Sequence, residues 1–374
     1  MNFTLSEDHL ALRESAQSFL AKEVNLDPYL RPEANERPVV RDRLWNAIQG
    51  LGWPGMVIPE AYGGLGMTYI DMVMVVAELG RTLAPSPFFG TIAGSWAIER
   101  CGSEAQKQAL LPKVAAGELT LALAVADPNG DVNGLSAGAK ATRHGEQWTI
   151  SGQKSFVVEA GSADEIVVVA DVDGQQGFFL VDAKAVGVAI ERLDWRDITR
   201  EVNAVSFDNV AAERLAEADN DSWMWIRDRL YLVLAAESAA GAEQSLADTV
   251  AYAKERIAFG RPIGAYQAIK HSLAELAGGI ELATAGVQFA AWALSEDRPE
   301  ARKAAAIAQS YASERYCDTT FRSIQVFGAI GFTWEMRNHL YYKRARANAE
   351  LLGSPRDQRE QLVCLIEAEH REAA

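Results

Sequence analysis

Apolar side chains recur at helical spacing along the first third of the chain. In residues 5–23 they fall on one helical face, and Ser6 precedes them as an N-cap. The same spacing predicts four further helices, at residues 42–51, 71–81, 88–99 and 104–116, the last capped by Ser103. Segment 27–38, with three prolines, and the glycine-rich segment 59–66 predict loops. The first 118 residues are therefore predicted to be all-α.

The pattern changes at Leu119. Short runs rich in β-branched and aromatic residues, separated by Gly, Asp and Asn, follow one another to residue 212. The tetrapeptide His144–Gln147 fits a hairpin turn between two of these runs. Their spacing predicts a small antiparallel barrel or sandwich. No G-x-G-x-x-G motif follows a strand, which disfavours a Rossmann dinucleotide fold.

Helical spacing returns at Asp221 and continues to the end of the chain. Four long segments rich in Ala and Leu predict a bundle, at residues 223–256, 265–295, 299–329 and 335–350. A shorter helix is predicted at 357–369. The predicted fold class is therefore α+β. We expect an N-terminal helical domain (1–118), a central β domain (119–220) and a C-terminal helical bundle (221–374).

The net charge and the cysteine content exclude several classes of function. The net charge of −15 argues against general binding to nucleic acid or to membrane surfaces, because both are polyanionic. Cys101, Cys317 and Cys364 are widely spaced, which predicts neither a disulfide framework nor a zinc site. We also expect no signal peptide and no membrane span, and hence a cytoplasmic protein without a metal.

The stretch Tyr252–Leu276 carries candidate binding chemistry. It reads R-x-x-F-G-x-P-I and then Q-x-x-K, with Arg256 as a fixed cation and Phe259 as an aromatic face. An arginine and an aromatic ring beside a helix break suit a ligand that has both a phosphate and a flat ring. An ordinary corner between two helices is the alternative interpretation.

This stretch resembles the corresponding segment of the acyl-CoA dehydrogenase family. Two further segments are similar to signatures of that family: WPGMVIPEAYGGLG from Trp53, and QVFGAIGFTW from Gln325. The segments follow the order and spacing of the family over nearly the whole chain. The resemblance implies the same succession of helical, β and bundle domains.

The resemblance also implies an FAD site between the β domain and the bundle, completed by a neighbouring subunit. Arg256 would contact the pyrophosphate, Phe259 would pack by the flavin, and Gln267 would lie near the cofactor. Gln325, Gly328 and Gly331 would approach the ADP part from the other subunit. Glycine suits such positions because the backbone must come close to the ligand. The chain has Ala329 where the family usually has a second glycine.

Val125, Phe156 and Val158 would form the wall of the β domain against the flavin. In the family this wall carries hydroxyl groups that bind the flavin. Here Ala126–Asp127 replaces a Thr-Glu pair, Asp131–Asn133 replaces Gly-Ser-Asp, and Val158 replaces a threonine. Backbone donors would have to substitute for these hydroxyls. Lys154 is expected to be structural and to span the sheet.

The family's reaction is α,β-dehydrogenation, in which a carboxylate removes the α proton and the flavin takes a hydride from the β carbon. The two positions that carry this carboxylate in the family align with Leu230 and Leu352. Glu237 lies two helical turns after Leu230 and is our candidate base. It would otherwise be a structural carboxylate paired with Lys270 or Arg322. Glu350 is a weaker candidate, and the chain would have no base if neither serves.

Two functions of different classes follow. The chain would be an FAD-dependent acyl-CoA dehydrogenase that passes electrons to an electron-transfer flavoprotein. Alternatively, it would be a non-catalytic partner subunit of a heteromeric enzyme. The run GFTWEMRNHLYYKRA resembles subunits of bacterial steroid side-chain and CoA-ester catabolism, some of which form α2β2 tetramers. A flavin oxidase or monooxygenase on the same scaffold is a third option. We expect a homo-oligomer or an α2β2 hetero-oligomer.

Overall fold

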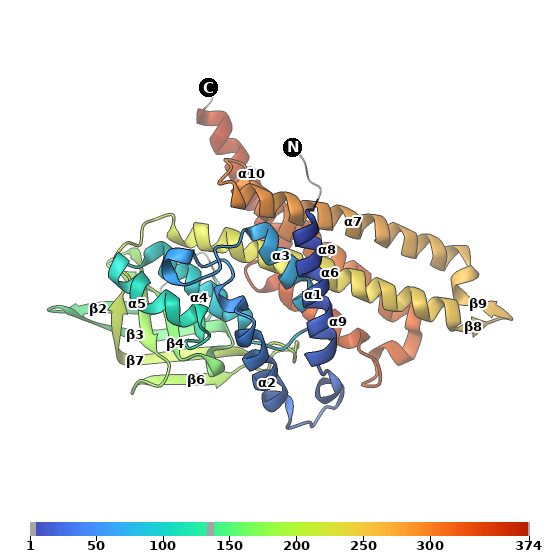
Figure 1. Cartoon of the computed structure of the whole chain (residues 1–374), viewed down its shortest axis with the longest axis horizontal. Helices are drawn as coiled ribbons and strands as arrows, with labels where there is room; N and C mark the ends of the chain where they lie inside the picture. Colours follow the sequence, from blue (N-terminus) through green and yellow to red (C-terminus); the bar gives the residue numbers. More distant parts are fainter. Residues whose placement is uncertain (1–4, 133–137, 373–374) are drawn as a thin grey trace.

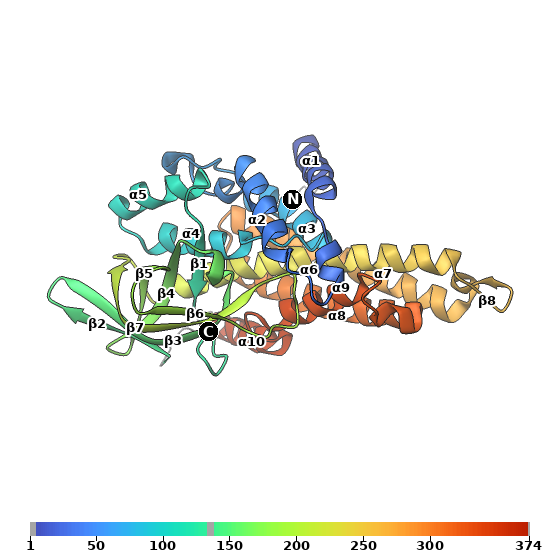
Figure 2. The same ribbon diagram turned by 90° about the horizontal axis from the view of Figure 1, so that it is seen from below.

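The computed structural model describes residues 5–132 and 138–372. Helices, strands and helices follow one another along the chain, as the sequence predicts. In Figure 1 the strands of the central sheet gather at one end, and the long helices α6, α7 and α8 extend from them to the other end. Figure 2 shows the N-terminal helices packed along one side of this arrangement.

Five helices form the N-terminal part. They are α1 (Glu7–Glu23), α2 (Arg37–Gly50), α3 (Tyr69–Arg81), α4 (Phe88–Cys101) and α5 (Glu104–Ala115). The predicted caps are confirmed, because the Ser6 and Ser103 side chains accept hydrogen bonds from the third backbone N–H of α1 and α5. Helix α4 is buried on nearly all sides, so it forms the centre of this layer.

The predicted start of α2 was wrong by five residues. The helix begins at Arg37, inside the segment that its prolines marked as a loop. Pro38 occupies its first turn, where the missing N–H of proline would have no partner in a helix anyway. A short 3₁₀ turn, Asp27–Leu30, also lies within that segment.

Seven strands form the central sheet: β1 (Leu121–Ala124), β2 (Ala139–His144), β3 (Gln147–Val158), β4 (Glu165–Val172), β5 (Gln175–Asp182), β6 (Val188–Arg192) and β7 (Val202–Arg214). The hairpin turn at His144–Gln147 is confirmed by the pairing of these two residues. Strands β4, β2, β3, β7 and β5 pair in a ring that closes because β5 also pairs with β4. The sheet is therefore a barrel, with a second hydrophobic core inside it.

The barrel differs from the prediction in the direction of two pairings. Strand β1 runs parallel to β4, and β2 meets β4 in a parallel sense through Lys140 and Asp171. The remaining pairings in the barrel are antiparallel. Parallel neighbours need a long connection, which a pattern of local turns does not reveal.

Five helices complete the chain: α6 (Ser222–Glu255), α7 (Gln267–Ser295), α8 (Ala301–Phe327), α9 (Asn338–Glu350) and α10 (Pro355–Glu372). Two short strands, β8 (Ile257–Ala258) and β9 (Arg261–Pro262), form a small hairpin between α6 and α7. Both views place this hairpin at the end of the molecule away from the barrel.

Helices α3 and α6 cross in very close contact. A Cβ atom built on Gly80 of α3 would lie 2.5 Å from the Cα atom of Glu237 on α6, much closer than carbon atoms approach without bonding. One hydrophobic core therefore runs from the N-terminal helices through the bundle without interruption. Among the described residues, no helix is long and apolar enough to cross a membrane.

Candidate active site

A small cavity of about 30 Å³ lies where the barrel, α4 and the bundle meet. The described residues that line it are all apolar or aromatic and come from five parts of the fold: Phe89, Gly90, Ala93, Leu123, Val125, Ala126, Val132, Phe156, Val158, Trp223, Leu230, Leu351 and Leu352. Such a cavity suits an apolar group or one face of a flat ring.

Both positions that align with the family's catalytic carboxylate face this cavity. Leu230 is on α6 and only 1% exposed, while Leu352 is in the turn after α9 and 9% exposed. The hydroxyl of Tyr231 donates a hydrogen bond of 3.3 Å to the carbonyl of Leu352 and so holds that turn against α6. Two buried leucines therefore line the cavity at the positions where the family's reaction would need a catalytic carboxylate.

The predicted wall of the β domain converges on the same cavity. Val125, Phe156 and Val158 all line it. Lys154 lies behind them, with its ammonium group donating to the carbonyl of Val125 at 2.9 Å and to Asp127 Oδ1 at 2.8 Å. Burial lowers the pKa of Lys154, and Asp127 opposes that shift. Lys154 thus spans from β3 to the end of β1. Asn133, of the loop that follows, is outside the described residues.

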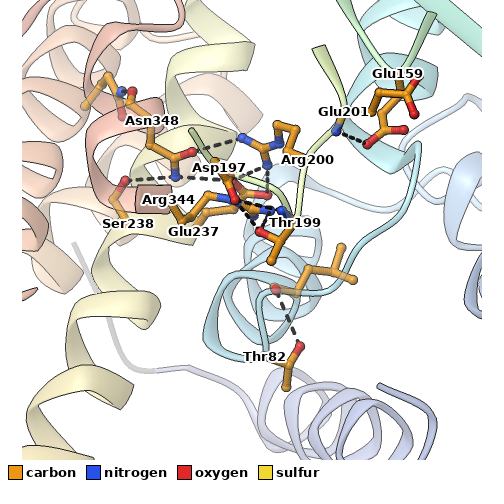
Figure 3. A network of polar contacts seen from close by, with 12 residues as sticks. Thr82, Glu159, Asp197, Thr199, Arg200, Glu201, Glu237, Ser238, Arg344 and Asn348 are labelled. Atoms are coloured by element: carbon orange, nitrogen blue, oxygen red, sulfur yellow. Dashed lines mark hydrogen bonds and ion pairs between the residues drawn. The ribbon is translucent and has the colours of Figure 1, made fainter. Parts of the chain in front are cut away.

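Glu237 does not line the cavity; its carboxylate belongs to a buried polar network (Figure 3). Nη2 of Arg200 lies 2.7 Å from both oxygens of Glu237. The side-chain amide of Asn348 donates to Oε2 of Glu237 at 3.3 Å and accepts from Nη1 of Arg200 at 2.9 Å. The guanidinium of Arg200 lies 5.1 Å from the ring of Phe89, which itself lines the cavity. The carboxylate is therefore engaged beside the cavity rather than in it.

The structure corrects the partner expected for this carboxylate. Arg322 is bound by Asp318 and Glu275, and Lys270 is exposed on α7. The cation is instead Arg200, in the segment between β6 and β7. Glu350, the weaker candidate, is exposed at the end of α9, and its carboxylate does not line the cavity either.

A second buried ion pair extends the network. Arg344 of α9 pairs with Asp197, and its guanidinium also donates to the hydroxyl of Thr199 at 2.7 Å. Burial opposes the charge of Arg344, but Asp197 and Glu237 outweigh it and raise the pKa of the guanidinium above its ordinary value. These residues tie the β6–β7 segment to α9. One signal in the sequence could have pointed to them, namely the charges grouped at Asp194–Glu201.

The other predicted cofactor residues lie together at the distal end, which we define as residues 256–267 and 325–334. Arg256 caps the C-terminus of α6, Gln267 begins α7, and both side chains are exposed. Phe259 is 97% exposed and has a φ of 51°. An aromatic ring presented to solvent in this way is suited to being covered by a ligand or by another chain.

The two halves of the distal end are held side by side by aromatic stacking. The rings of Tyr252 and Phe327 lie 4.1 Å apart and 13° from parallel, so the end of α6 contacts the end of α8. Gln325 and Gly328 are exposed next to this stack, whereas Gly331 is buried. Gly328 has a φ of 71° and a ψ of −147°, a conformation that belongs to glycine, and a Cβ there would meet nothing within 4 Å.

These groups fit the two ends of FAD but do not meet within one chain. The apolar cavity offers a wall for the flavin ring, and the distal end offers a cation for the pyrophosphate, an aromatic ring for a flavin and an open glycine for the ADP part. Figures 1 and 2 show the distal hairpin and the barrel at opposite ends of the molecule. The arrangement therefore fits a cofactor that one chain contacts at the ring and another at the ADP part.

His339, the second residue of α9, is a further buried residue near the distal end. It is 5% exposed, and neither ring nitrogen forms a hydrogen bond with any described residue. Burial is the main cause that lowers the pKa of His339 to about 4, and the positive charge of Lys343 adds to the shift. Its ring packs edge-on against Trp334, 4.8 Å away, so it supports the distal end. No group of His, Cys, Asp or Glu side chains within 5–132 and 138–372 is arranged to hold a metal ion.

Comparisons with known proteins agree with this architecture. Three family models match: the acyl-CoA dehydrogenase N-terminal domain at residues 6–118, the middle domain at 122–210 and the C-terminal domain at 229–363. The acyl-CoA dehydrogenase IpdE2 of Mycobacterium tuberculosis is 33% identical over 360 residues, which are 95% of this chain and 96% of that protein.

Two solved structures extend the likeness to three dimensions. A variant of the Tcur3481–Tcur3483 steroid acyl-CoA dehydrogenase has a TM-score of 0.87 at 28% identity, over 98% of this chain and all of that one. Butyryl-CoA dehydrogenase from Megasphaera elsdenii has a TM-score of 0.85 at 25% identity, over 96% and 97% of the two chains. With three family models in order and these relatives covering nearly all of it, the chain belongs to the acyl-CoA dehydrogenase family of flavin-dependent oxidoreductases, whose cofactor is FAD.

Proposed function

We propose that this chain is one subunit of a hetero-oligomeric acyl-CoA dehydrogenase and that a paralogous partner supplies the catalytic base. The observation that carries the proposal is the apolar cavity, in which Leu230 and Leu352 occupy both positions available to the base. The reaction requires a carboxylate that removes the α proton of the thioester. Among the described residues, no side chain that lines this cavity can accept a proton.

Glu237 is a poor substitute for the missing base. Its two oxygens already bind Arg200, and breaking a buried ion pair on one side costs about 3–5 kcal/mol. A general base instead needs a carboxylate whose charge the surroundings disfavour, so that it binds a proton near neutral pH. In this proposal Glu237 therefore holds the β6–β7 segment against α6 and takes no part in proton transfer.

The distal end is the part of this chain that would serve the partner. Arg256 would bind the pyrophosphate of the partner's FAD, Phe259 would pack by its flavin, and Gln325 would approach its ADP part. When bound, FAD supplies the hydride acceptor for the reaction. The exposure of Phe259 supports this role, because an aromatic side chain that is 97% exposed packs on nothing in its own chain.

The proposal also covers the substrate of the enzyme, its electron acceptor and its location in the cell. A CoA ester with a bulky, steroid-type acyl chain is suggested by the relative named as a steroid acyl-CoA dehydrogenase, whose name joins two components. Transfer of electrons to an electron-transfer flavoprotein is suggested by a 27% identical relative from Acetobacterium woodii, named as a subunit of a caffeyl-CoA reductase–Etf complex. The three cysteines are free, which agrees with a cytoplasmic location.

The test compares the isolated chain with a complex. The chain is expressed alone and together with a paralogue that carries a glutamate at one of the two base positions, and each preparation is titrated anaerobically with a panel of acyl-CoA esters. We expect the flavin band to bleach only in the complex. Bleaching and turnover by a homo-oligomer of this chain would contradict the proposal and make its own site catalytic.

A matched pair of variants identifies which carboxylate acts. Replacing the partner's glutamate with glutamine should abolish turnover in the complex and leave the flavin bound. The substitution Glu237→Gln in this chain should leave the turnover of each folded complex unchanged. If Glu237→Gln alone abolished turnover while stability was retained, Glu237 would be the base after all.

A further inference from the structure

A second pocket, of about 30 Å³, lies behind the wall of the apolar cavity. We call it the arginine pocket. The residues that line it come from α2, the neighbouring loops and the β6–β7 segment: Tyr29, Arg37, Pro38, Arg41, Pro85, Glu159, Arg192, Ile198, Thr199 and Glu201. Glu159 directly follows Val158, which lines the apolar cavity, so the two sites lie on either side of one short segment.

Three arginines and two glutamates line this pocket, and the carboxylate of Asp42 lies 3.0 Å from Arg41. Arg41 is neutralised, since its Nη1 lies 3.0 Å from Glu201 and 3.7 Å from Glu159. Arg37 and Arg192 form no ion pair within 4 Å in the part of the chain that the structure describes. Two unneutralised guanidinium groups at one small pocket are a typical setting for an anion.

Arg37 is held in place by groups that do not cancel its charge. Its Nε donates to the carbonyl of Pro28 at 3.0 Å, and its Nη2 donates to the carbonyls of Arg31 and Pro32 at 2.6 and 3.2 Å. These hydrogen bonds use Nε and Nη2 of Arg37, and none of them uses its Nη1. A guanidinium fixed by backbone carbonyls is prepared for an anion, because little side-chain freedom is lost on binding.

Glu159 has one oxygen for which the fold supplies no donor. The side chain is 1% exposed, and its backbone has a φ of 57°. Oε1 accepts the N–H of Glu201 at 2.9 Å, while Oε2 accepts no hydrogen bond from any residue within the described ranges. A buried carboxylate oxygen without a donor is costly, and a proton or a ligand that donates to it would remove the cost.

We propose that the arginine pocket binds a small tetrahedral oxyanion of the phosphate class, held by Arg37 and Arg192 beside Glu159. The size of the pocket favours the ion itself, or a single phosphate group of a larger molecule, over a whole nucleotide. The site is separate from the apolar cavity and does not depend on the proposed subunit role. Binding there would act on the Phe156–Val158 wall through the residue that follows it.

The charges around Glu159 predict a proton linkage. Burial raises the pKa of Glu159 to about 7, opposed by Arg41 and Arg200 and assisted by Glu201. The other charged or titratable groups at the pocket are Arg37, Arg192 and Tyr29, together with Asp42 against Arg41. An anion beside Glu159 favours its protonated form, because the repulsion between like charges is removed. The anion should therefore bind more tightly below the pKa of Glu159 than above it.

Isothermal titration of the isolated full chain with sulfate tests the site. Sulfate keeps one charge state between pH 5 and 9, so any pH dependence of its binding comes from the protein. We expect one site per chain, with an affinity that falls as pH rises through about 7. Phosphate and free coenzyme A, titrated alone and in competition with sulfate, distinguish a free ion from the phosphate of a CoA compound.

Two variants and a control decide the outcome. The substitution Arg192→Ala at an exposed position should weaken sulfate binding by about tenfold, the loss expected for one charge-assisted contact. The substitution Glu159→Gln should abolish the pH dependence. The substitution Arg356→Ala on α10 removes an equally positive, 81% exposed side chain elsewhere and should change nothing. The proposal is overturned if sulfate does not bind, or if Arg192→Ala and Arg356→Ala bind it as the wild type does.

Discussion

The cavity end and the distal end of this molecule differ in what they offer a cofactor and a substrate. At the cavity, Leu230 and Leu352 stand at both positions where the resemblance to the family places a carboxylate, and apolar side chains form the wall predicted for the flavin. At the distal end, the residues expected to bind the ADP part are present, and Phe259 is 97% exposed. In the proposed function, the chain presents cofactor-binding groups to a neighbour and has no base of its own at the cavity. This contrast is what a supporting subunit would show.

The largest effect should come from the buried network beside the cavity. The substitution Glu237→Gln leaves Arg200 charged, buried and without its anion, and should lower the free energy of unfolding by about 3–5 kcal/mol. Urea unfolding followed by circular dichroism measures this. The double substitution of Glu237 and Arg200 by Leu and Met should recover most of the loss. A stable Glu237→Gln chain would show that the pair does not support the cavity end.

The next effect depends on pH and concerns the other side of the cavity wall. Because burial raises the pKa of Glu159 from 4.5 to about 7, the folded state binds a proton more tightly than the unfolded state between these values. The free energy of unfolding should therefore fall as pH rises through this window, by on the order of 3 kcal/mol.

The substitution Glu159→Gln should remove this pH dependence and make the chain more stable than the wild type at pH 8. Unfolding in urea at pH 5 and pH 8 gives the comparison. Glu146→Gln, at an exposed turn of the barrel, is the control and should leave the dependence intact. If the free energy of unfolding depended on pH in the same way in the wild type and in Glu159→Gln, the raised pKa of Glu159 would be contradicted.

A substitution at the distal end should weaken the binding of FAD and should leave the stability of the fold unchanged. The substitution Arg256→Ala should weaken FAD retention in the hetero-oligomer by about 2 kcal/mol, or roughly thirtyfold, through the loss of a charge-assisted phosphate contact. Flavin release during dilution and gel filtration measures it. Arg261→Ala is a matched control on the same hairpin, because Arg261 stacks on Tyr266 at 4.1 Å within its own chain. Equal losses in both variants would argue against a specific role for Arg256.

The smallest effect should be that of Phe259→Ala on the isolated chain. A side chain that is 97% exposed contributes little to folding, so the free energy of unfolding should change by less than about 0.5 kcal/mol. The same variant should weaken the assembled complex, which analytical ultracentrifugation against the partner measures. A large loss of stability in the isolated chain would mean that Phe259 packs within its own subunit.

Much of the fold could be predicted because local patterns determine it. Helices α6, α7 and α8 begin and end within about two residues of the predicted positions, since long apolar periodicity and sharp breaks mark them. The parallel partners of β4 could not be predicted, because they depend on contacts between residues far apart in the chain. The early start of α2 was missed because proline, which usually ends a helix, is tolerated in its first turn.

The site was predictable in its parts but not in its arrangement. The sequence singled out Val125, Phe156 and Val158, and the fold brings them to one cavity with both leucines. It also identified Glu237 as a carboxylate in an apolar run, but it could not identify Arg200, which lies 37 residues earlier in another domain. An ion pair between residues so far apart in the chain depends on how the domains pack, and no local sequence pattern predicts it.

The close crossing of α3 and α6 makes Gly80 a spacer that sets the size of the cavity. Any side chain at this position would force the two helices apart by roughly 1 Å, the difference between the available gap and an ordinary carbon contact. Helix α6 carries Leu230 on the wall of the cavity, so a wedge at Gly80 would move that wall as one rigid piece. The shape of the cavity is therefore set in part by a residue that does not line it.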